Sequence, residues 1–525
     1  MGEFRLLDCT LRDGGYINDW NFGNQTIKNI IQDLVESHID YVEIGFLRNC
    51  EYNKNKTLYN CIAEAKKILP ENQQNTKFVL MALHNLYDIK KLEICDGTIE
   101  HIRVTFHDYD IDDGLTFCKK VIEKGYKCFC NPINIMGYSD EKLLWLIEKI
   151  NLLSPYAFSI VDTFGSMTLN DLVRIYLLVE HNLDPSIVLG LHLHENLSLA
   201  YALAQKYTNI VSPFRESVID ASMQGIGRVP GNLCMELIMD YMNKTFGKTY
   251  DVNPVLDGID DYIARLKEVE AWGYSTAYAL SAQHNLHRNY SEFFLNKGKL
   301  KAKQINQILA SIDNNKKTVF DRSYAEKLYQ NFQNIAIDDT DSRKMFKAVL
   351  KNREVLLLAP GATLNSEMDK INEFIREKKP LIFAINFLPI DYTADYIFFS
   401  NIKRLEKISS EYSLDQYLIT SNLINSNIKV KNVFNYYDLA YQNNKLYDNS
   451  AIMLIRLLQQ LGVPGVYIAG MDGYEKSKKN YCVDYIHSYH IQNYAFENRE
   501  IESHLLQLKH QINIQFLTST LYQFK

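Results

Sequence analysis

The chain has 525 residues, of which 46% are hydrophobic and 23% charged, and its formal net charge is −6. This profile is typical of a globular protein with more than one domain, and the negative balance argues against nucleic acid or a membrane surface as the main partner. Nine scattered cysteines without a Cys-x-x-Cys pair, no signal-peptide pattern and no bilayer-length apolar stretch predict a cytoplasmic protein with reduced thiols.

Residues 1–248 are expected to form the catalytic domain, because short apolar runs alternate there with amphipathic helical segments. Strands that alternate with helices tend to run parallel, since each helix serves as the crossover. Eight such units in about 250 residues predict a (β/α)₈ TIM barrel within an α/β fold class, with a doubly wound open sheet as the alternative. The eight expected strands are Phe4–Asp8, Tyr41–Phe46, Lys77–Ala82, His101–Phe106, Tyr126–Pro132, Ala157–Asp162, Ile187–His194 and Ser217–Met223.

Two further segments follow the barrel pattern. Residues 249–345 are expected to be a helical appendage that packs on the barrel or on a second subunit, so a homo-oligomer is among the expectations. Residues 346–525 return to alternating strands and helices and predict a Rossmann-like α/β domain. Its expected strands are Val355–Ala359, Leu381–Asn386, Tyr396–Ser400 and Val466–Ala469.

A candidate metal site lies where the barrel strands end. His192 and His194 are two residues apart in a strand, so both imidazoles point to the same face. Asp13 follows the first strand, and Asn232, after the eighth, can add an amide oxygen. A His-x-His pair alone is often an ordinary core or surface pair, but together with the aspartate it predicts an open divalent-metal site. Mixed imidazole and oxygen ligands favour Mn²⁺ or Mg²⁺.

Four motifs resemble the superfamily of metal-dependent aldolases, lyases and Claisen-condensing enzymes, and are most similar to its 4-hydroxy-2-oxovalerate aldolase branch. The resemblance covers residues 4–245 and implies that Asp13, His192 and His194 bind the metal; Asn232 matches a ligand of the lyase branch. The motifs are Leu7–Gly14 (LDCTLRDG), Val161–Gly165 (VDTFG), His192–Ala200 (HLHENLSLA) and the glycine-rich segment Ile219–Glu236.

The same resemblance implies roles for residues beside the metal. Arg12 matches the arginine that stabilises the enolate, and we expect Glu43 to hold Arg12 in place through a charge-assisted hydrogen bond. The aldolases carry an acid–base histidine where this chain has Tyr16. Tyr16 and Tyr290 are therefore the candidates for proton transfer, although Tyr16 could equally be a wall of the pocket.

These features predict a divalent-metal-dependent aldolase that acts on pyruvate or another 2-oxo acid, with a small or sugar-like aldehyde as partner. The fused second domain suggests surface-sugar biosynthesis as the context. One alternative keeps the barrel but changes the reaction to acyl-CoA Claisen condensation or lyase chemistry. Another is a nucleotide-binding or transferase protein whose barrel is a non-catalytic scaffold.

The carboxyl-terminal domain contains a strand followed by Pro360-Gly361-Ala362-Thr363 and a helix start. Backbone N–H groups at such a turn favour a phosphate. Parts of residues 353–475 resemble the nucleotide-binding domain of bacterial sialyltransferases and of pterin diphosphokinase-like proteins. That resemblance implies binding of a nucleotide or nucleotide-sugar by Gly361, Thr363 and Asn386. The alternative is a structural domain without a ligand.

Overall fold

The computed structural model describes residues 3–228, 230–407, 412–442, 445–476, 478–483, 486 and 493–523. It divides into two compact units. The barrel unit comprises Met1–Arg288 and Asp313–Val319, and the sheet unit comprises Asn289–Ile312 and Phe320–Lys525. Among the described residues, no helix combines the length and the apolar character needed to cross a membrane.

The barrel unit is built on eight parallel strands that close into a ring, because β1 pairs with both β2 and β9. The predicted TIM barrel is therefore confirmed, and the open-sheet alternative is wrong. A two-residue strand, β3 (Leu58–Tyr59), adds to β2 outside the ring. The ring strands are β1 (Phe4–Asp8), β2 (Tyr41–Leu47), β4 (Lys77–Leu83), β5 (His101–Phe106), β6 (Lys127–Pro132), β7 (Ala157–Asp162), β8 (Val188–Leu193) and β9 (Ser217–Ala221).

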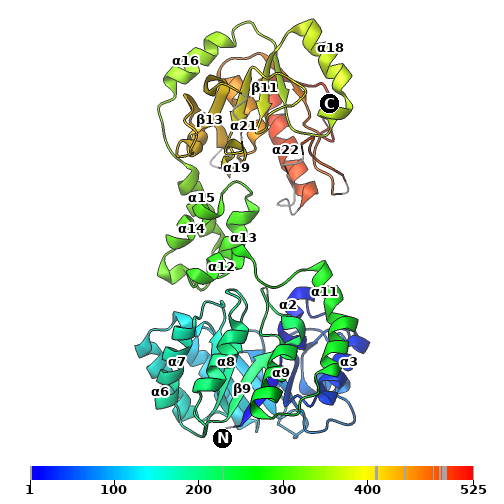
Figure 1. The fold of residues 1–525 in the computed structure, drawn as a ribbon, viewed down its shortest axis with the longest axis vertical. Coiled ribbons are helices and arrows are strands. Elements are labelled where there is room, and N and C mark those ends of the chain that lie inside the picture. Colours follow the sequence, from blue (N-terminus) through cyan, green and yellow to red (C-terminus); the bar gives the residue numbers. More distant parts are fainter. Residues whose placement is uncertain are drawn as a thin grey trace. The chain divides into compact units, whose positions relative to one another are not determined.

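Helices surround the ring (Figure 1). Each long helix of this layer buries one apolar face. In α3 (Asn24–Glu36), for example, Ile27, Ile30, Ile31 and Leu34 are buried at helical spacing. Every residue of β2, β7, β8 and β9 is buried, which explains why these strands are nearly continuous apolar runs in the sequence. The other helices of this layer are α5 (Ile111–Glu123), α6 (Asp140–Leu153), α7 (Leu169–Asn182), α8 (Ala200–Ile210) and α9 (Met235–Phe246).

The segment after the barrel is helical, as predicted, and its first part belongs to the barrel unit. The helices there are α10 (Asn253–Gly258), α11 (Ala264–Val269) and α12 (Thr276–Gln283). The connecting residues contact the loop after β9: the Trp272 indole N–H donates to the Gln224 carbonyl at 2.9 Å, and Arg228 contacts His287 Nε2 at 2.7 Å. This segment therefore covers part of the ring's carboxyl face.

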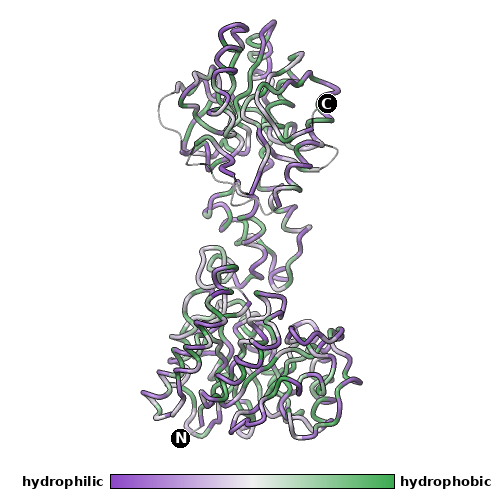
Figure 2. The backbone as a smooth tube through the Cα atoms, turned by 90° about the vertical axis from the view of Figure 1, so that its right-hand side faces the viewer, coloured by the Kyte–Doolittle hydropathy of each residue, from purple (hydrophilic) through white to green (hydrophobic). Residues whose placement is uncertain are grey.

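The sheet unit contains a seven-stranded parallel sheet, which confirms the predicted second α/β fold. Its order is β14-β13-β12-β11-β10-β17-β18. The strands β11 to β14 therefore lie on one side of β10, and β17 and β18 lie on the other. Hydrophobic segments lie inside each unit, and hydrophilic ones run along its exposed helices and loops (Figure 2). The strands are β10 (Val355–Leu358), β11 (Leu381–Ile385), β12 (Tyr396–Phe399), β13 (Tyr417–Thr420), β14 (Asn432–Phe434), β17 (Gly465–Ala469) and β18 (Asn513–Phe516).

The sheet unit also contains helices that precede its first strand in the chain and helices that connect its strands. Four precede the first strand, so the segment predicted as one helical appendage, residues 249–345, is shared between the two units. They are α13 (Asn289–Asn296), α14 (Ala302–Ala310), α15 (Arg322–Gln333) and α16 (Thr340–Val349). Three long helices lie among the strands: α18 (Met368–Lys378), α21 (Ser450–Gln460) and α22 (Tyr494–Lys509).

Candidate metal centre

Three side chains that are distant in the sequence meet at the carboxyl end of the ring. Asp13 ends α1 (Thr10–Asp13), the short helix that follows β1, while His192 lies in β8 and His194 just beyond it. One potential ligand atom from each residue lies within 4.8 Å of the others, and all three residues are buried. The structure thus brings together the three residues that the sequence predicts as metal ligands.

Both imidazoles are oriented through Nδ1. His192 Nδ1 lies 2.9 Å from Asp220 Oδ2, and His194 Nδ1 lies 3.1 Å from the Gly231 carbonyl oxygen. Such contacts make Nδ1 the protonated nitrogen and leave Nε2 as a lone-pair donor, the usual arrangement of metal-binding histidines. Burial, with the neighbouring His192, lowers the pKa of His194 to about 3, so this ring is neutral as a ligand must be.

Asn232 completes the candidate oxygen ligands. Its Nδ2 donates to Asp13 Oδ2 at 2.8 Å, whereas its buried Oδ1 has no hydrogen-bond partner among the described residues. A buried amide oxygen without a donor is costly unless something else binds it. Gly227 borders the same space, because a Cβ there would lie 2.2 Å from Asn232 Nδ2 and 2.7 Å from Asp13 Oδ2. The residues present therefore fit a divalent cation.

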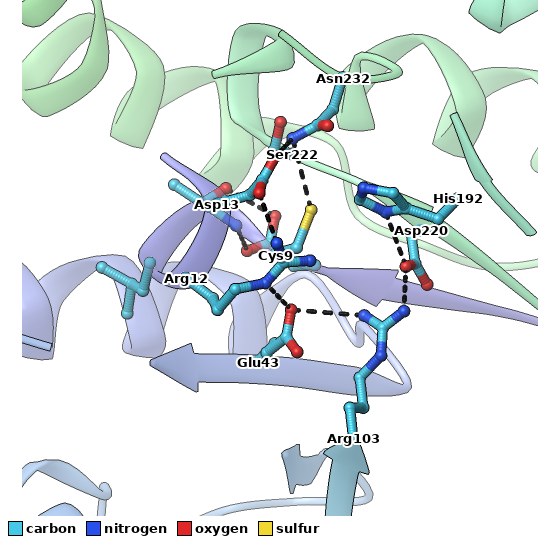
Figure 3. Close-up of polar contacts among 12 residues, drawn as sticks. Cys9, Arg12, Asp13, Glu43, Arg103, His192, Asp220, Ser222 and Asn232 are labelled. Carbon is cyan, nitrogen blue, oxygen red and sulfur yellow. Dashed lines mark hydrogen bonds and ion pairs between the residues drawn. The ribbon is translucent and has the colours of Figure 1, made fainter. Parts of the chain in front are cut away.

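A chain of buried ion pairs joins the ligands to neighbouring strands (Figure 3). Arg12 pairs with Asp13 and donates from Nε to Glu43 Oε2 at 2.6 Å, so the predicted contact between Glu43 and Arg12 is present. Arg103 donates to the same Glu43 oxygen at 3.3 Å and also pairs with Asp220. Asp220 in turn contacts His192, so one network connects both sides of the candidate metal centre.

The charges of this network are unequal. Two guanidinium groups, of Arg12 and Arg103, face three carboxylates, of Asp13, Glu43 and Asp220. Burial raises the pKa of Asp13, but the Arg12 guanidinium, helped by the hydrogen bond from Asn232, outweighs it and holds that pKa well below its ordinary value. These five groups carry one negative charge in excess, which a cation would balance.

The two predicted proton-transfer residues lie in different surroundings. Tyr16, in α2 (Gly15–Asn18), is 44% exposed, and its ring packs against Trp20 and Phe46 with centroids 4.8 and 6.4 Å away. Tyr290 belongs to the sheet unit, where it is fully buried against Phe320. Its hydroxyl accepts a hydrogen bond from the backbone N–H of Asp321 at 3.3 Å. The structure therefore does not bring Tyr290 into the cluster of the barrel unit.

The three predicted nucleotide-binding residues make internal hydrogen bonds. The Thr363 N–H donates to Asp472 Oδ2 at 2.9 Å, and the Thr363 hydroxyl also contacts that carboxylate. A Cβ on Gly361 would lie 2.6 Å from the same carboxyl group. Asn386 Oδ1 accepts from the Ser400 N–H at 3.1 Å. The glycine turn therefore already faces an anionic side chain.

Sequence reasoning missed three residues of this region. Arg103 lies in β5 between the apolar residues Ile102 and Val104, and this polar–apolar alternation could have revealed it. Asp220 lies in the motif Ile219–Glu236 but was not singled out. His287, whose ring lies 6.0 Å from that of Phe164, contacts Arg228 and had no sequence signal, because it lies far from the strand motifs.

The closed parallel ring and its buried Asp–His–His cluster define a (β/α)₈ barrel with a candidate divalent-metal centre. Residues 3–258 match the HMGL-like family model, so this part of the chain is an HMGL-like domain, the type found in metal-dependent lyases and aldolases. The predicted resemblance to that superfamily is thus confirmed.

Individual relatives are distant. The 4-hydroxy-2-oxovalerate aldolase of Moorella thermoacetica is 24% identical over 276 residues, which cover 50% of this chain and 77% of that protein. The oxaloacetate decarboxylase of Mycobacterium tuberculosis is 20% identical over 239 residues, covering 45% and 68%. The solved amino-terminal domain of a protein described as an aldolase from Bacteroides vulgatus is 26% identical, with a TM-score of 0.49 and coverage of 56% and 96%.

Proposed function

We propose that the barrel unit is a divalent-metal-dependent aldolase that cleaves or forms a carbon–carbon bond next to the carbonyl of pyruvate or another 2-oxo acid. The observation that carries the proposal is the buried cluster of Asp13, His192 and His194 with Arg12 beside it. A divalent cation, with Mn²⁺ or Mg²⁺ favoured, would supply Lewis acidity toward the substrate carbonyl.

Arg12 supplies the second positive charge. Burial opposes its charged form, but Glu43 and Asp13 raise its pKa well above the ordinary value, so the guanidinium stays protonated. A fixed cation in a site shielded from water stabilises negative charge that develops as the bond to the keto acid breaks. Glu43 orients Arg12 and does not need to touch the substrate.

Tyr16 is the proposed group for proton transfer to or from the partner hydroxyl. It stands in the turn after Arg12 and Asp13, is 44% exposed and can therefore reach a bound substrate. Tyr16→Phe should keep metal binding and lower the rate of aldol cleavage. Unchanged cleavage would assign Tyr16 to the pocket wall.

Solvent deuterium exchange into the methyl group of pyruvate tests the proposal without the aldehyde. We expect metal-dependent exchange that disappears in Asp13→Ala and in His194→Ala. Arg12→Ala should still bind the metal and lose most of the exchange rate, because its charge acts in the transition state. Exchange that proceeds equally with and without metal would refute the proposed function.

The sheet unit supports a second proposal, that it binds a nucleotide or nucleotide-sugar. A cavity of about 880 Å³ lies within this unit, and its lining includes Pro360 and Gly361 after β10 and Gly470 after β17. The strands that follow β10 in the chain, up to β14, lie on one side of it, and β17 and β18 lie on the other. Parallel sheets commonly bind ligands at the point where the strand order reverses in this way. Because Asp472 already occupies the glycine turn, the phosphates of a nucleotide would have to bind elsewhere in the cavity.

Calorimetric titration with nucleoside diphosphates and with the parent nucleosides tests this second proposal. Both should bind the wild-type protein, and Asp472→Asn should strengthen binding of the diphosphates more than that of the nucleosides, because it removes an anion from the turn. Absence of binding by both series at millimolar concentration would refute it.

A further inference from the structure

A second arginine stands at the mouth of the barrel. Arg48 directly follows β2, whose inward side chain Glu43 belongs to the buried network. Its guanidinium carbon lies 4.6 Å from the centroid of the Phe46 ring, and the guanidinium carbon of Arg12 lies 5.9 Å from the same centroid. Arg48 and Arg12 therefore lie near the same aromatic ring, and Arg12 pairs with Asp13 of the candidate metal centre.

Arg48 differs from three buried arginines of the barrel unit in having no carboxylate partner among the described residues. Arg12, Arg103 and Arg215 each pair with at least one carboxylate. Within the described parts of the chain, no carboxylate lies within 4 Å of the Arg48 guanidinium, although this side chain is partly buried. Burial lowers the pKa of Arg48, against a small opposing effect of Tyr16 and Cys50. A partly desolvated guanidinium without a counter-ion favours binding of an anion.

The surroundings of Arg48 are held in place by a strained turn. Asp19 and Trp20 both have left-handed backbone conformations, with φ of 54° and 57°. The turn is fixed on both sides, because the Trp20 indole N–H donates to the Arg12 carbonyl at 2.8 Å and the Trp20 carbonyl accepts from the Thr57 N–H at 3.1 Å. Such strain persists where the surrounding contacts determine the conformation, often at ligand sites.

The turn also fixes an aromatic wall beside the arginine. The rings of Trp20 and Phe46 are 5.6 Å apart and nearly perpendicular, and Tyr16 packs on both. A Cβ on Gly15 would lie 2.0 Å from the Trp20 ring, so a larger residue at this position would displace it. Three aromatic side chains and one cation thus lie together at the carboxyl end of the ring.

We infer that Arg48 binds an anionic group, a carboxylate or a phosphate, on the aldehyde partner of the proposed reaction. The inference rests on the proposed function and adds the substrate class: an aldehyde with a negative charge at its far end. Arg12 and the candidate metal ligands serve the 2-oxo acid, whereas Arg48 serves the second reactant. A guanidinium matches both anions with two parallel hydrogen bonds.

The test compares charged aldehydes with neutral partners of similar size in the full-length protein with metal. Succinic semialdehyde is paired with butanal, and glyceraldehyde 3-phosphate with glyceraldehyde, so that the two arms distinguish carboxylate from phosphate. We expect kcat/KM for at least one charged member to exceed that of its neutral partner by about 10- to 100-fold, the usual effect of a charge-assisted contact. Arg48→Gln should abolish this preference and Arg48→Lys should keep part of it.

Pyruvate exchange separates the failure of this inference from that of the proposed function. Arg48→Gln should exchange pyruvate protons with wild-type KM and rate, as should the control Arg265→Gln, which removes an exposed arginine in α11. A raised KM for pyruvate in Arg48→Gln would assign this cation to the 2-oxo acid and overturn the inference, as would equal kcat/KM for charged and neutral aldehydes. Should wild-type protein show no exchange, the proposed function fails, and titration with inorganic phosphate and with succinate decides whether Arg48 binds an anion.

Discussion

Replacing Asp220 by asparagine tests whether the buried ion-pair network tunes the candidate metal centre. The carboxylate accepts from His192 Nδ1 at 2.9 Å and pairs with Arg103, and none of the three side chains is appreciably exposed. Burial raises the pKa of Asp220, but Arg103 and His192 outweigh it, so the group is ionised. Asparagine keeps the shape and removes the charge.

Two separate losses follow from this change. A partner that orients a ligating histidine typically contributes about 10- to 100-fold to metal affinity, or roughly 1.4 to 2.8 kcal/mol. Arg103 would also lose a buried anionic partner, and breaking such a pair costs about 3 to 5 kcal/mol of stability. The double variant Arg103→Met/Asp220→Asn should therefore regain part of the stability that Asp220→Asn loses, while its affinity for the metal stays low.

Titration with Mn²⁺, followed by calorimetry or by the loss of the free-ion signal, measures the affinity, and thermal unfolding measures the stability. Asp162→Asn is the matched control, because burial raises the pKa of this carboxyl to about 7 and it accepts from the backbone N–H groups of Ser166 and Met167 at 2.9 and 3.2 Å. Wild-type Mn²⁺ affinity in Asp220→Asn, or an equal loss in Asp162→Asn, would refute the reasoning.

Three further predictions concern other positions. Gly227→Ala should weaken Mn²⁺ binding at least 10-fold in the same titration without unfolding the barrel, because its Cβ would lie 2.2 Å from Asn232 Nδ2. Burial lowers the pKa of His101 to about 3, so this imidazole is neutral in the folded protein at neutral pH. The free energy of unfolding should therefore fall as the pH falls from about 6.5 toward 3, by up to ~1.4 kcal/mol per pH unit. The thermal midpoint of His101→Phe should depend less on pH over this range. Asp448→Ala should destabilise the sheet unit by about 1 to 3 kcal/mol in thermal unfolding, because this partly buried carboxylate accepts from the Tyr329 and Tyr436 hydroxyls at 2.9 and 3.0 Å.

The sequence predicted the barrel strands to within one or two residues because a strand buried on both faces is an uninterrupted apolar run. The predicted strands of the second sheet did not include β13, β14 and β18, and the two edge strands among them, β14 and β18, show the limit of that pattern. β14 has three residues and β18 four, and polar residues interrupt the apolar pattern of both, as in Asn513-Ile514-Gln515-Phe516. In such short edge strands the pairing partner, and not the local sequence, determines the conformation.

The residues of the candidate site also fall into two groups, those that could be predicted from the sequence and those that could not. Asp13, His192 and His194 could be predicted because each lies at or just beyond the carboxyl end of a ring strand. The link from Glu43 through Arg103 to Asp220 could not, since it depends on which inward side chains face one another across the closed barrel. That choice is set by the strand register, which appears only when the ring is complete.

The ring closes where β1 pairs with β9, the first and last of its strands. Asp13 follows β1, whereas His192 and His194 come from β8, on the far side of β9. An ion bound by all three residues would therefore link strands on both sides of the β1–β9 pairing. Separation of β1 from β9 would break up its ligand set and release the ion. By mass action, a free ion concentration of 100 times the dissociation constant would add about 2.7 kcal/mol to the free energy of unfolding of the barrel.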